Sequence, residues 1–276
     1  MGFIRVLALE SRRAFSSGRF LATMIIGVIF VVCHIVLFVV PEATEQAMYI
    51  LQWGYPLSVY NRWLGGWFGT VFPTIFFFFL PLLVCVPYSD TLYLDKKTGW
   101  ANQVTIRSSR AAYYGAKVLI VFSMGVIVAC VPLVLDFYLT CMFLPLVQPS
   151  VASGLFPIFN ESLWHDLYYA DPLVYNLRYM ALIATTCGLL ACLPLALSKM
   201  LSNRPLLVCS SFFICVILNY LFGRNYTAGF SPMSFMRPDQ PFMYTSFSDI
   251  CVTLLLLALA VGMGIAWVWR SDDVGI

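Results

Sequence analysis

The sequence predicts an all-α polytopic membrane protein with six transmembrane helices, an N-terminal interfacial amphipathic helix and both termini in the cytoplasm. The first observation is the composition. Of all residues, 61% are hydrophobic and only 11% are charged, whereas soluble domains carry about 25% charged residues. The second is a set of six apolar segments near the roughly 20 residues that cross a bilayer. The third is the gathering of Lys and Arg on one side of these segments.

All six segments belong to one membrane domain that covers residues 1–276. The fourth and fifth segments are joined only by residues 198–204, so they are expected to form a tight antiparallel hairpin. The predicted spans are residues 21–40, 67–87, 116–139, 175–197, 205–222 and 247–269.

Residues 1–20 precede the first span and have a helical periodicity of their own, which is not typical of a cleavable signal. Small and apolar side chains share one face, namely Ile4, Leu7, Ala8, Ser11, Ala14 and Phe15. The basic side chains are Arg5, Arg12, Arg13 and Arg19. This pattern predicts a helix in the cytoplasmic interface with its basic side on the lipid headgroups. The alternative is an ordinary positively charged anchor before the first span.

The first two spans each contain residues that are unusual in lipid. His34 is the only ionisable side chain of the first span, and a hydrogen bond to another helix or a role in transport would each explain it. The second span contains Pro73, Pro81 and Pro87, each of which lacks a backbone donor. We therefore expect the second span to bend and to pack against other protein.

Four ionisable side chains in the spans are candidates for a transport path: His34, Asp136, Arg178 and Asp249. The last three lie near the outer ends of their spans, where a charge close to water is the simpler interpretation. Asp249 would lie in the first turn of the sixth helix, where a negative charge is favoured. The sequence contains no catalytic motif, metal-ligand spacing or phosphate-binding loop, so the chain by itself is not predicted to hydrolyse ATP.

The Lys and Arg residues outside the spans set the predicted orientation. One side carries Arg5, Arg12, Arg13, Arg19, Lys96, Lys97, Arg107, Arg110, Lys117, Lys199, Arg204 and Arg270. The other side carries Arg62, Arg224 and Arg237, while Arg178 lies at a span edge. This bias of 12 to 3 predicts that both termini and residues 88–117 are cytoplasmic.

The predicted outer segments, residues 146–174 and 224–246, are rich in aromatic residues and proline. Both patterns favour short amphipathic or re-entrant pieces at the outer interface, where Trp and Tyr are stable. They could form a lid over an outer exit, or they could be plain interfacial caps.

Residues 88–117 form the only long, strongly basic polar stretch between spans. The position of Gly99 within this stretch predicts a short helix that ends near it and a second helix that leads into the third span. Together the two helices would form a compact knob. Solvated charges that hold anionic lipid, at about 1 kcal/mol each, are the simpler explanation for the basic residues alone. The charged and turn-forming residues of the stretch are Asp90, Asp95, Lys96, Lys97, Gly99, Arg107, Arg110 and Lys117.

This stretch resembles the first cytoplasmic loop of type-2 ABC exporter permeases. The resemblance rests on Tyr88, Ser89, Asp90, Thr91, Asp95, Lys96, Lys97, Thr98, Gly99, Arg107, Arg110, Tyr113 and Lys117. Two departures are Trp100 and Ala101, where the family commonly has Thr-Leu, and the absence of a proline before the basic pair. The pattern is most similar to a less-studied bacterial branch of the family.

The resemblance implies a transport subunit of the bacterial cytoplasmic membrane that moves a lipid, peptide or drug-like amphiphile. Two cytoplasmic ABC ATPase subunits, which would hold the ATP and Mg, would dock on residues 1–20 and 88–117. A second permease, identical or homologous, would complete the transporter, and membrane lipids would surround it. No cofactor on this chain and no nucleic-acid partner are expected.

Two other interpretations remain open from the sequence. A non-pumping sensing or immunity subunit that binds a peptide at its outer loops would share the topology. A membrane enzyme would need the four ionisable residues of the spans to converge at one depth.

Overall fold

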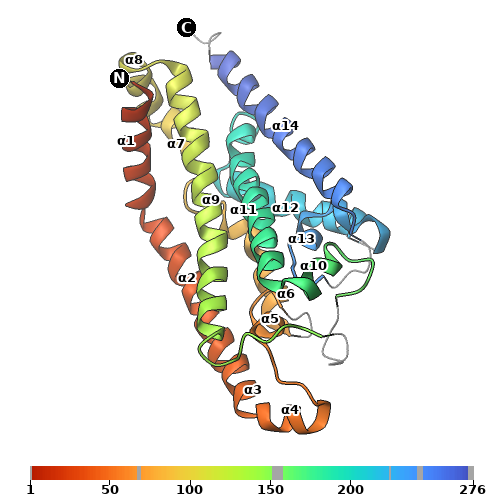
Figure 1. The fold of residues 1–276 in the computed structure, drawn as a ribbon. Coiled ribbons are helices and arrows are strands. Elements are labelled where there is room, and N and C mark those ends of the chain that lie inside the picture. The colour runs from red at the N-terminus through yellow and green to blue at the C-terminus, as the bar shows by residue number, and fades with distance from the viewer. Residues whose placement is uncertain (1, 67–69, 151–157, 224, 241–244, 273–276) are drawn as a thin grey trace.

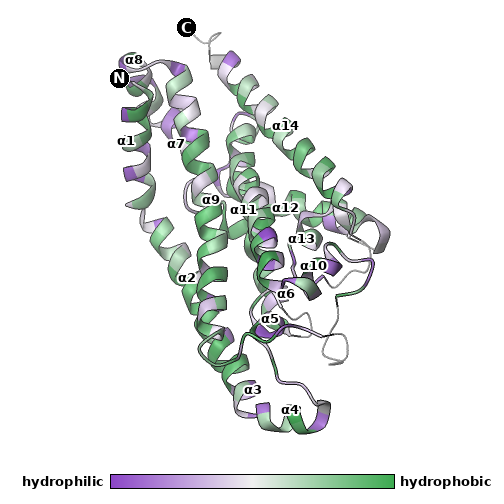
Figure 2. Ribbon diagram, viewed as in Figure 1, coloured by the Kyte–Doolittle hydropathy of each residue, from purple (hydrophilic) through white to green (hydrophobic). Residues whose placement is uncertain are grey.

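The computed structural model describes residues 2–66, 70–150, 158–223, 225–240 and 245–272, and every regular element in these ranges is a helix. Five helical runs in the described part are long and apolar enough to cross a membrane. They are Gly18–Thr44, Arg110–Thr140, Pro172–Leu197, Arg204–Phe222 and Phe247–Arg270. The fold is therefore that of a multi-pass helical membrane protein, and hydrophobic residues cover the long helices (Figure 2).

The first span is longer than the sequence predicts because three helical segments join end to end. It consists of α2 (Gly18–His34), the π-helical turn η1 (Ile35–Val39) and α3 (Val40–Thr44). Before it, α1 (Phe3–Phe15) packs against α9 (Arg110–Thr140) and lies roughly in line with α2 (Figure 1). The amphipathic helix predicted for residues 1–20 thus uses one face to pack on protein, which differs from the expected helix in the plane of the interface.

The second predicted span is shorter than expected. Helix α6 (Val71–Leu83) has 13 residues, and a turn follows it through Asp90. At 1.5 Å per residue, α6 is roughly 20 Å long, less than the roughly 30 Å of a hydrocarbon core. Pro87, four residues after the last residue of α6, cannot donate the backbone hydrogen bond that would extend the helix, whereas Pro81 lies inside it. Residues 67–69, at the start of the predicted span, lie outside the described residues.

The other four predicted spans correspond to α9, α11 (Pro172–Leu197), α12 (Arg204–Phe222) and α14 (Phe247–Asp272). Helix α9 begins at Arg110, so Lys117 lies two turns inside it rather than at its start. Ser109 caps α9 by accepting the Ala112 N–H, and Asp171 caps α11 by accepting the Val174 N–H. Such caps satisfy donors that the first turn of a helix leaves without partners.

Helix α11 is the central helix and packs against both α9 and α14 (Figure 1). The close approach to α9 needs Gly125, because a Cβ there would lie 2.7 Å from the Cys187 carbonyl oxygen. Gly264 has the same role between α14 and α11, where a Cβ would lie 2.5 Å from the Ala196 Cβ. These contacts position the ends of α9 and α14 on either side of α11.

The two ends of the bundle carry different elements. Helix α1, α7 (Thr91–Lys97), α8 (Trp100–Arg107) and the end of α14 lie at one end (Figure 1). Short helices lie between residues 46 and 62 and in the described parts of the two outer segments. These short elements are α4 (Gln46–Trp53), α5 (Val59–Arg62), α10 (His165–Ala170), the 3₁₀ helix η3 (Asn225–Phe230) and α13 (Pro232–Phe235).

Candidate functional site: a buried ion network that holds the α7–α8 hairpin

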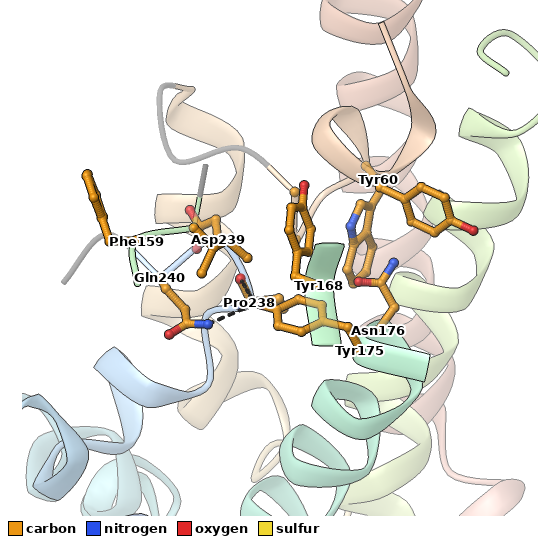
Figure 3. A pocket seen from close by; sticks show the side chains of 12 residues that line it. Tyr60, Phe159, Tyr168, Tyr175, Asn176, Pro238, Asp239 and Gln240 are labelled. Carbon is orange, nitrogen blue, oxygen red and sulfur yellow. Dashed lines mark hydrogen bonds between the residues drawn. The ribbon is translucent and has the colours of Figure 1, made fainter. Parts of the chain in front are cut away.

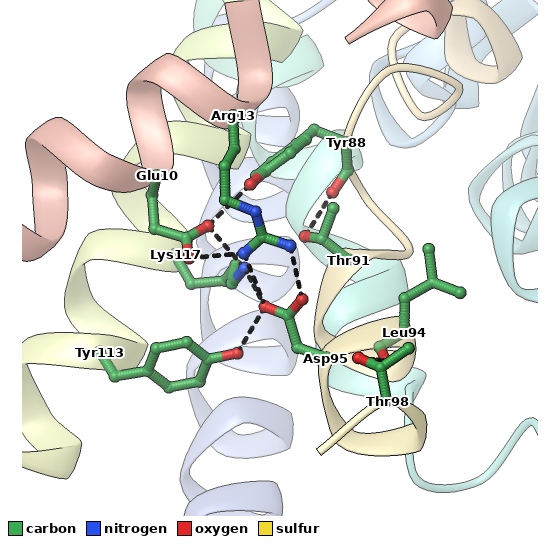
Figure 4. A network of polar contacts seen from close by, with 9 residues as sticks. All are labelled: Glu10, Arg13, Tyr88, Thr91, Leu94, Asp95, Thr98, Tyr113 and Lys117. Carbon is green, nitrogen blue, oxygen red and sulfur yellow. Dashed lines mark hydrogen bonds and ion pairs between the residues drawn. The ribbon is translucent and has the colours of Figure 1, made fainter. Parts of the chain in front are cut away.

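Six polar side chains from three separate parts of the chain meet at the end of the bundle that carries α1, α7 and α8 (Figure 4). We call this group the α1–α7–α9 network. Its members are Glu10, Arg13, Tyr88, Asp95, Tyr113 and Lys117.

Lys117 is at the centre of the network. Its Nζ donates to Glu10 Oε2 and to Asp95 Oδ2, each at 2.6 Å. Arg13 closes the group, because Nη2 lies 2.8 Å from Asp95 Oδ1 and Nη1 lies 3.0 Å from Glu10 Oε1. Two carboxylates thus face two cations, and the charges of the network balance.

Two tyrosines complete the hydrogen bonding of the carboxylates. Tyr88 OH donates to Glu10 Oε2 at 2.7 Å, and Tyr113 OH donates to Asp95 Oδ2 at 2.8 Å. Both tyrosine rings also lie 5.3 Å from Lys117 Nζ, within the range of cation–π contacts. The network is therefore satisfied by charge, by hydrogen bonds and by aromatic faces.

Burial makes this balance necessary. Glu10, Asp95 and Lys117 are at most 1% exposed, whereas the Arg13 side chain is 34% exposed. Burial opposes ionisation of Asp95, but the hydrogen bond from Arg13 and the charge of Lys117 outweigh it, so the pKa of the Asp95 carboxyl is lowered. For Arg13, burial likewise opposes the charge, and the Asp95 and Glu10 carboxylates reverse that effect and raise its pKa.

Helix α1 contributes to the network through a face that the sequence interpretation did not identify. Val6, Glu10 and Ala14 are its buried residues, and their spacing of four places them on one side of the helix. Glu10 was not among the predicted site residues, because one carboxylate in a basic amphipathic helix is usually exposed to solvent. The available signal was its i, i+4 spacing from Val6 and Ala14.

A second ion cluster lies beside the network. Asp90, which is buried, accepts Arg19 Nη1 at 2.7 Å and Arg204 Nε at 2.5 Å. Arg19 lies at the start of α2 and Arg204 at the start of α12. Asp90 therefore ties two spans to the turn that precedes α7.

The predicted knob is present as a two-helix hairpin. Helix α7 ends at Lys97 and α8 begins at Trp100, and between them Gly99 has a φ of 75°. This left-handed conformation suits glycine and closes the first helix. The two short helices expected around Gly99 are thus confirmed.

The charged residues predicted to dock a partner fall into two groups. Asp90, Asp95 and Lys117 are buried and paired inside the molecule, so these three residues are not part of an exposed surface. Lys97 and Arg107 are exposed, and Lys96 and Arg110 are partly exposed. Since Glu10 is buried too, the acidic residues of the described stretches 2–17 and 88–110 all lie inside, and the exposed charge there is basic.

The four arginines predicted for the interfacial helix divide in a similar way. Arg5 and Arg12 are exposed. Arg13 and Arg19 are only half-exposed and point inward to Asp95 and Asp90, so they do not form part of a free basic face as expected. The inward direction follows from the buried carboxylates.

Of the four predicted transport-path residues, the structure brings two together. His34 Nδ1 lies 2.6 Å from Asp136 Oδ1, which confirms the hydrogen bond between helices that was one explanation of His34. Asp136 Oδ2 also accepts the Leu64 N–H at 2.6 Å. Asp136 is fully buried, so the interpretation as a charge close to water is wrong for this residue.

Arg178 and Asp249 do not join this pair. Arg178 is exposed with its guanidinium 5.8 Å from the centre of the Trp164 ring. Asp249 lies in the first turn of α14, as predicted. The four residues therefore do not converge into one site. A further ion pair, between the buried Arg62 and the partly exposed Glu42, was not predicted.

The outer segments meet around a small polar pocket (Figure 3). Gln240 joins them, since its side chain accepts the Leu163 N–H at 2.7 Å and donates to the Tyr175 hydroxyl at 2.8 Å. Tyr60, Tyr168 and Asn176 also line the pocket. Its cavity is about 10 Å³, room for about one water molecule. A pocket of this size, lined by described residues, has no room for a peptide.

Comparison with known proteins adds no assignment. No protein-family model matches the sequence, and no curated protein or solved structure is similar to the chain. In the described part of the chain, no group of three His, Cys, Asp or Glu side chains is arranged to hold a metal ion. The site is thus defined by its own geometry, as an ion network that fastens a basic helical hairpin to the spans.

Proposed function

We propose that this chain is the membrane-spanning subunit of an ATP-driven exporter of the type-2 ABC class, which moves a lipid, peptide or drug-like amphiphile across the bacterial cytoplasmic membrane. The observation that carries the proposal is the α7–α8 hairpin with Asp95 of α7 held in the α1–α7–α9 network. A loop that only holds lipid by its charges needs no such internal lock. A loop that transmits force does.

The contacts give a route for that force. A displacement of α7 acts on α9 through the ion pair between Asp95 and Lys117, and on α1 through Arg13. Through Asp90 the same displacement acts on Arg19 of α2 and on Arg204 of α12. Four membrane or membrane-flanking helices are thus linked to one short element, and close packing makes such a group move together.

The exposed positive charge of α1, α7 and α8 supports a choice of partner. With the acidic residues buried, the outside of α1, α7 and α8 presents cations, including Arg5, Arg12, Lys97 and Arg107. This surface favours a partner with an acidic face, because complementary potentials speed association and fix orientation. We assign that partner as a pair of ABC ATPase subunits that hold the ATP and Mg, and a second permease as the other half of the transporter.

A valine at Gly99 should uncouple the transporter. Gly99→Val has free space for its Cβ, since no atom lies within 4 Å, but a side chain at this φ costs about 1–2 kcal/mol. The hairpin should shift while the spans stay folded. We expect normal amounts in the membrane, with an ATPase that fails to copurify or hydrolyses ATP without transport. The measurements are copurification, ATPase activity and transport in proteoliposomes.

Charge reversal at Arg110 should weaken the same contact. Arg110→Glu is expected to slow assembly with the ATPase, because charges at the rim of an interface act mainly on association. Gly54→Val, at a glycine of similar φ after α4, and Arg178→Glu, at the other end of the molecule, are the matched controls. If Gly99→Val and Arg110→Glu both copurify with a fully coupled ATPase, the hairpin does not dock the ATPase and the proposal fails.

The proposal also requires the α7–α8 hairpin to be cytoplasmic. A single cysteine at Asn102, an exposed residue of α8, should react with a membrane-permeant maleimide in intact cells and not with an impermeant one. A cysteine at Met48, exposed in α4, should show the opposite pattern. Labelling of the Asn102 position from outside would place the hairpin on the wrong side for an ATPase.

A further inference from the structure

Four ionisable side chains lie near one another at the end of α9 opposite the α1–α7–α9 network, on the predicted outer side. They form two pairs, His34 with Asp136 and Arg62 with Glu42. The ring of Phe38 contacts both pairs, because its centre lies 5.5 Å from the centre of the His34 ring and 6.0 Å from Arg62 Cζ. We call the four ionisable residues the outer cluster.

The π-helical turn η1 places His34 and Glu42 on nearly the same side of the first span. In a regular α-helix, residues eight positions apart differ by about 80° in direction. In η1 the Val40 N–H donates to the Ile35 carbonyl, five positions earlier, so the turn takes up about one extra residue and the difference falls to about 20°. Glu42 is then close enough to His34 for an electrostatic interaction. Such turns are rare and frequently accompany functional sites.

Burial makes charge balance important in the outer cluster. The side chains of His34 and Arg62 are 1% exposed and that of Asp136 is 0% exposed, whereas Glu42 is 18% exposed. A buried charge is costly unless an opposite charge compensates it. Glu42 is therefore the member of the cluster that contacts water, and the other three depend on one another for compensation.

The permanent charges of the outer cluster do not balance. The α1–α7–α9 network has two carboxylates and two cations, but the outer cluster has two carboxylates and only one permanent cation, Arg62. Histidine is the side chain that gains a positive charge near neutral pH. Balance is therefore reached when the cluster holds one additional proton, which His34 Nδ1 and Asp136 Oδ1 share across 2.6 Å.

The surroundings supply no buried charge that would complete the balance. In the described residues 20–66, 70–87 and 118–150, Glu45 is the only other Asp, Glu, Lys, Arg or His, and it is exposed. The neighbouring elements add exposed carboxylates, a histidine beside one of them, and phenols and thiols that are neutral at pH 7. These groups are Asp166, Asp171, His165, Tyr49, Tyr60, Tyr168, Tyr169, Cys33 and Cys141. Charges in water are screened and do not compensate a buried one.

We propose that the outer cluster is a proton-binding site, which takes one proton from the outer solution and holds it between His34 and Asp136. Glu42 provides the contact with that solution. Without the proton the buried cluster has a net negative charge, which weakens the attachment of the first span to α9. This inference needs only insertion into a membrane and does not depend on an ATPase partner.

Nuclear magnetic resonance of the full chain with ¹⁵N-labelled histidine tests the site, because the sequence contains only two histidines. The variant His165→Gln identifies the His34 signal. At pH 7.5 we expect both ring nitrogens of His34 to carry a proton. Asp136→Asn should lower the proton affinity of His34 by about tenfold or more, because an adjacent negative charge favours the charged imidazole.

Two further variants test the charge balance. Glu42→Gln keeps an oxygen that can accept from Arg62 but removes one carboxylate, so it should also lower the proton affinity of His34. Glu45→Gln removes an exposed carboxylate three residues further along and should leave that affinity unchanged. The His165 signal and the circular dichroism spectrum should not change in any of these variants, which checks that each is folded.

Three outcomes would overturn the proposal. The first is a neutral His34 ring at pH 7.5 in the unmodified protein. The second is a proton affinity of His34 that neither Asp136→Asn nor Glu42→Gln lowers. The third is an effect of Glu45→Gln as large as that of Glu42→Gln, because His34 would then respond to surface charge in general. If Asp136→Asn does not fold, the comparison of Glu42→Gln with Glu45→Gln decides.

Discussion

Replacing Lys117 by methionine should lower the free energy of unfolding by about 3–5 kcal/mol, because it removes one partner of a buried ion network. The substitution keeps the length of the side chain but removes the cation that lies 2.6 Å from both Glu10 and Asp95. Two buried carboxylates would then share Arg13 alone. Thermal denaturation in detergent, followed by circular dichroism, measures the loss.

Two variants separate the charge effect from a packing effect. Lys97→Met removes an exposed cation of α7 and should change the stability by less than about 0.5 kcal/mol. Adding Glu10→Gln to Lys117→Met leaves Asp95 paired with Arg13 and should recover part of the loss. A stability of Lys117→Met equal to that of the unmodified protein would mean that the network is not the lock of the hairpin.

The spans were predictable because their signal is local. About 20 consecutive apolar residues are sufficient to indicate a membrane helix, and the observed bounds of α11 and α12 lie within three residues of the predicted ones. The turn at Gly99 was predictable for the same reason, since one glycine between two short amphipathic stretches ends a helix. The shortened α6 shows the limit of prediction from hydropathy. Hydropathy alone takes no account of the backbone hydrogen-bond donors that prolines lack.

The partners of the charged residues could not be read from the sequence. Glu10 meets Lys117 across 107 positions and Arg13 meets Asp95 across 82. Nothing in the local pattern distinguishes a carboxylate that faces water from one that faces a cation on another helix. The sequence interpretation therefore placed Asp95 and Lys117 among the residues expected to act on a partner, whereas the structure pairs them with each other inside the molecule.

Replacing Asp136 by leucine should destabilise the other end of α9 by about 2–6 kcal/mol. The carboxylate holds His34 of α2 through one oxygen and the Leu64 N–H through the other, each at 2.6 Å. Leucine of similar size leaves both groups buried without that partner, and each such loss costs about 1–3 kcal/mol. The π-helical turn η1 begins directly after His34, so we expect α2 and α3 to loosen from α9 first.

Asp136→Asn is the matched control, because its amide oxygen can still accept the Leu64 N–H. The stability of this variant should fall by half as much as that of Asp136→Leu, or less.

Hydrogen exchange followed by mass spectrometry measures where the loss occurs. Faster exchange in Asp136→Leu is expected between residues 35 and 64, with α7 and α8 unchanged, since the α1–α7–α9 network lies at the opposite end of α9. A double-mutant cycle with His34→Leu isolates the pair, because removing both partners spares the penalty of one unpaired group. Equal stability of Asp136→Leu and Asp136→Asn, with no coupling to His34, would contradict a role for this hydrogen bond in holding the first span.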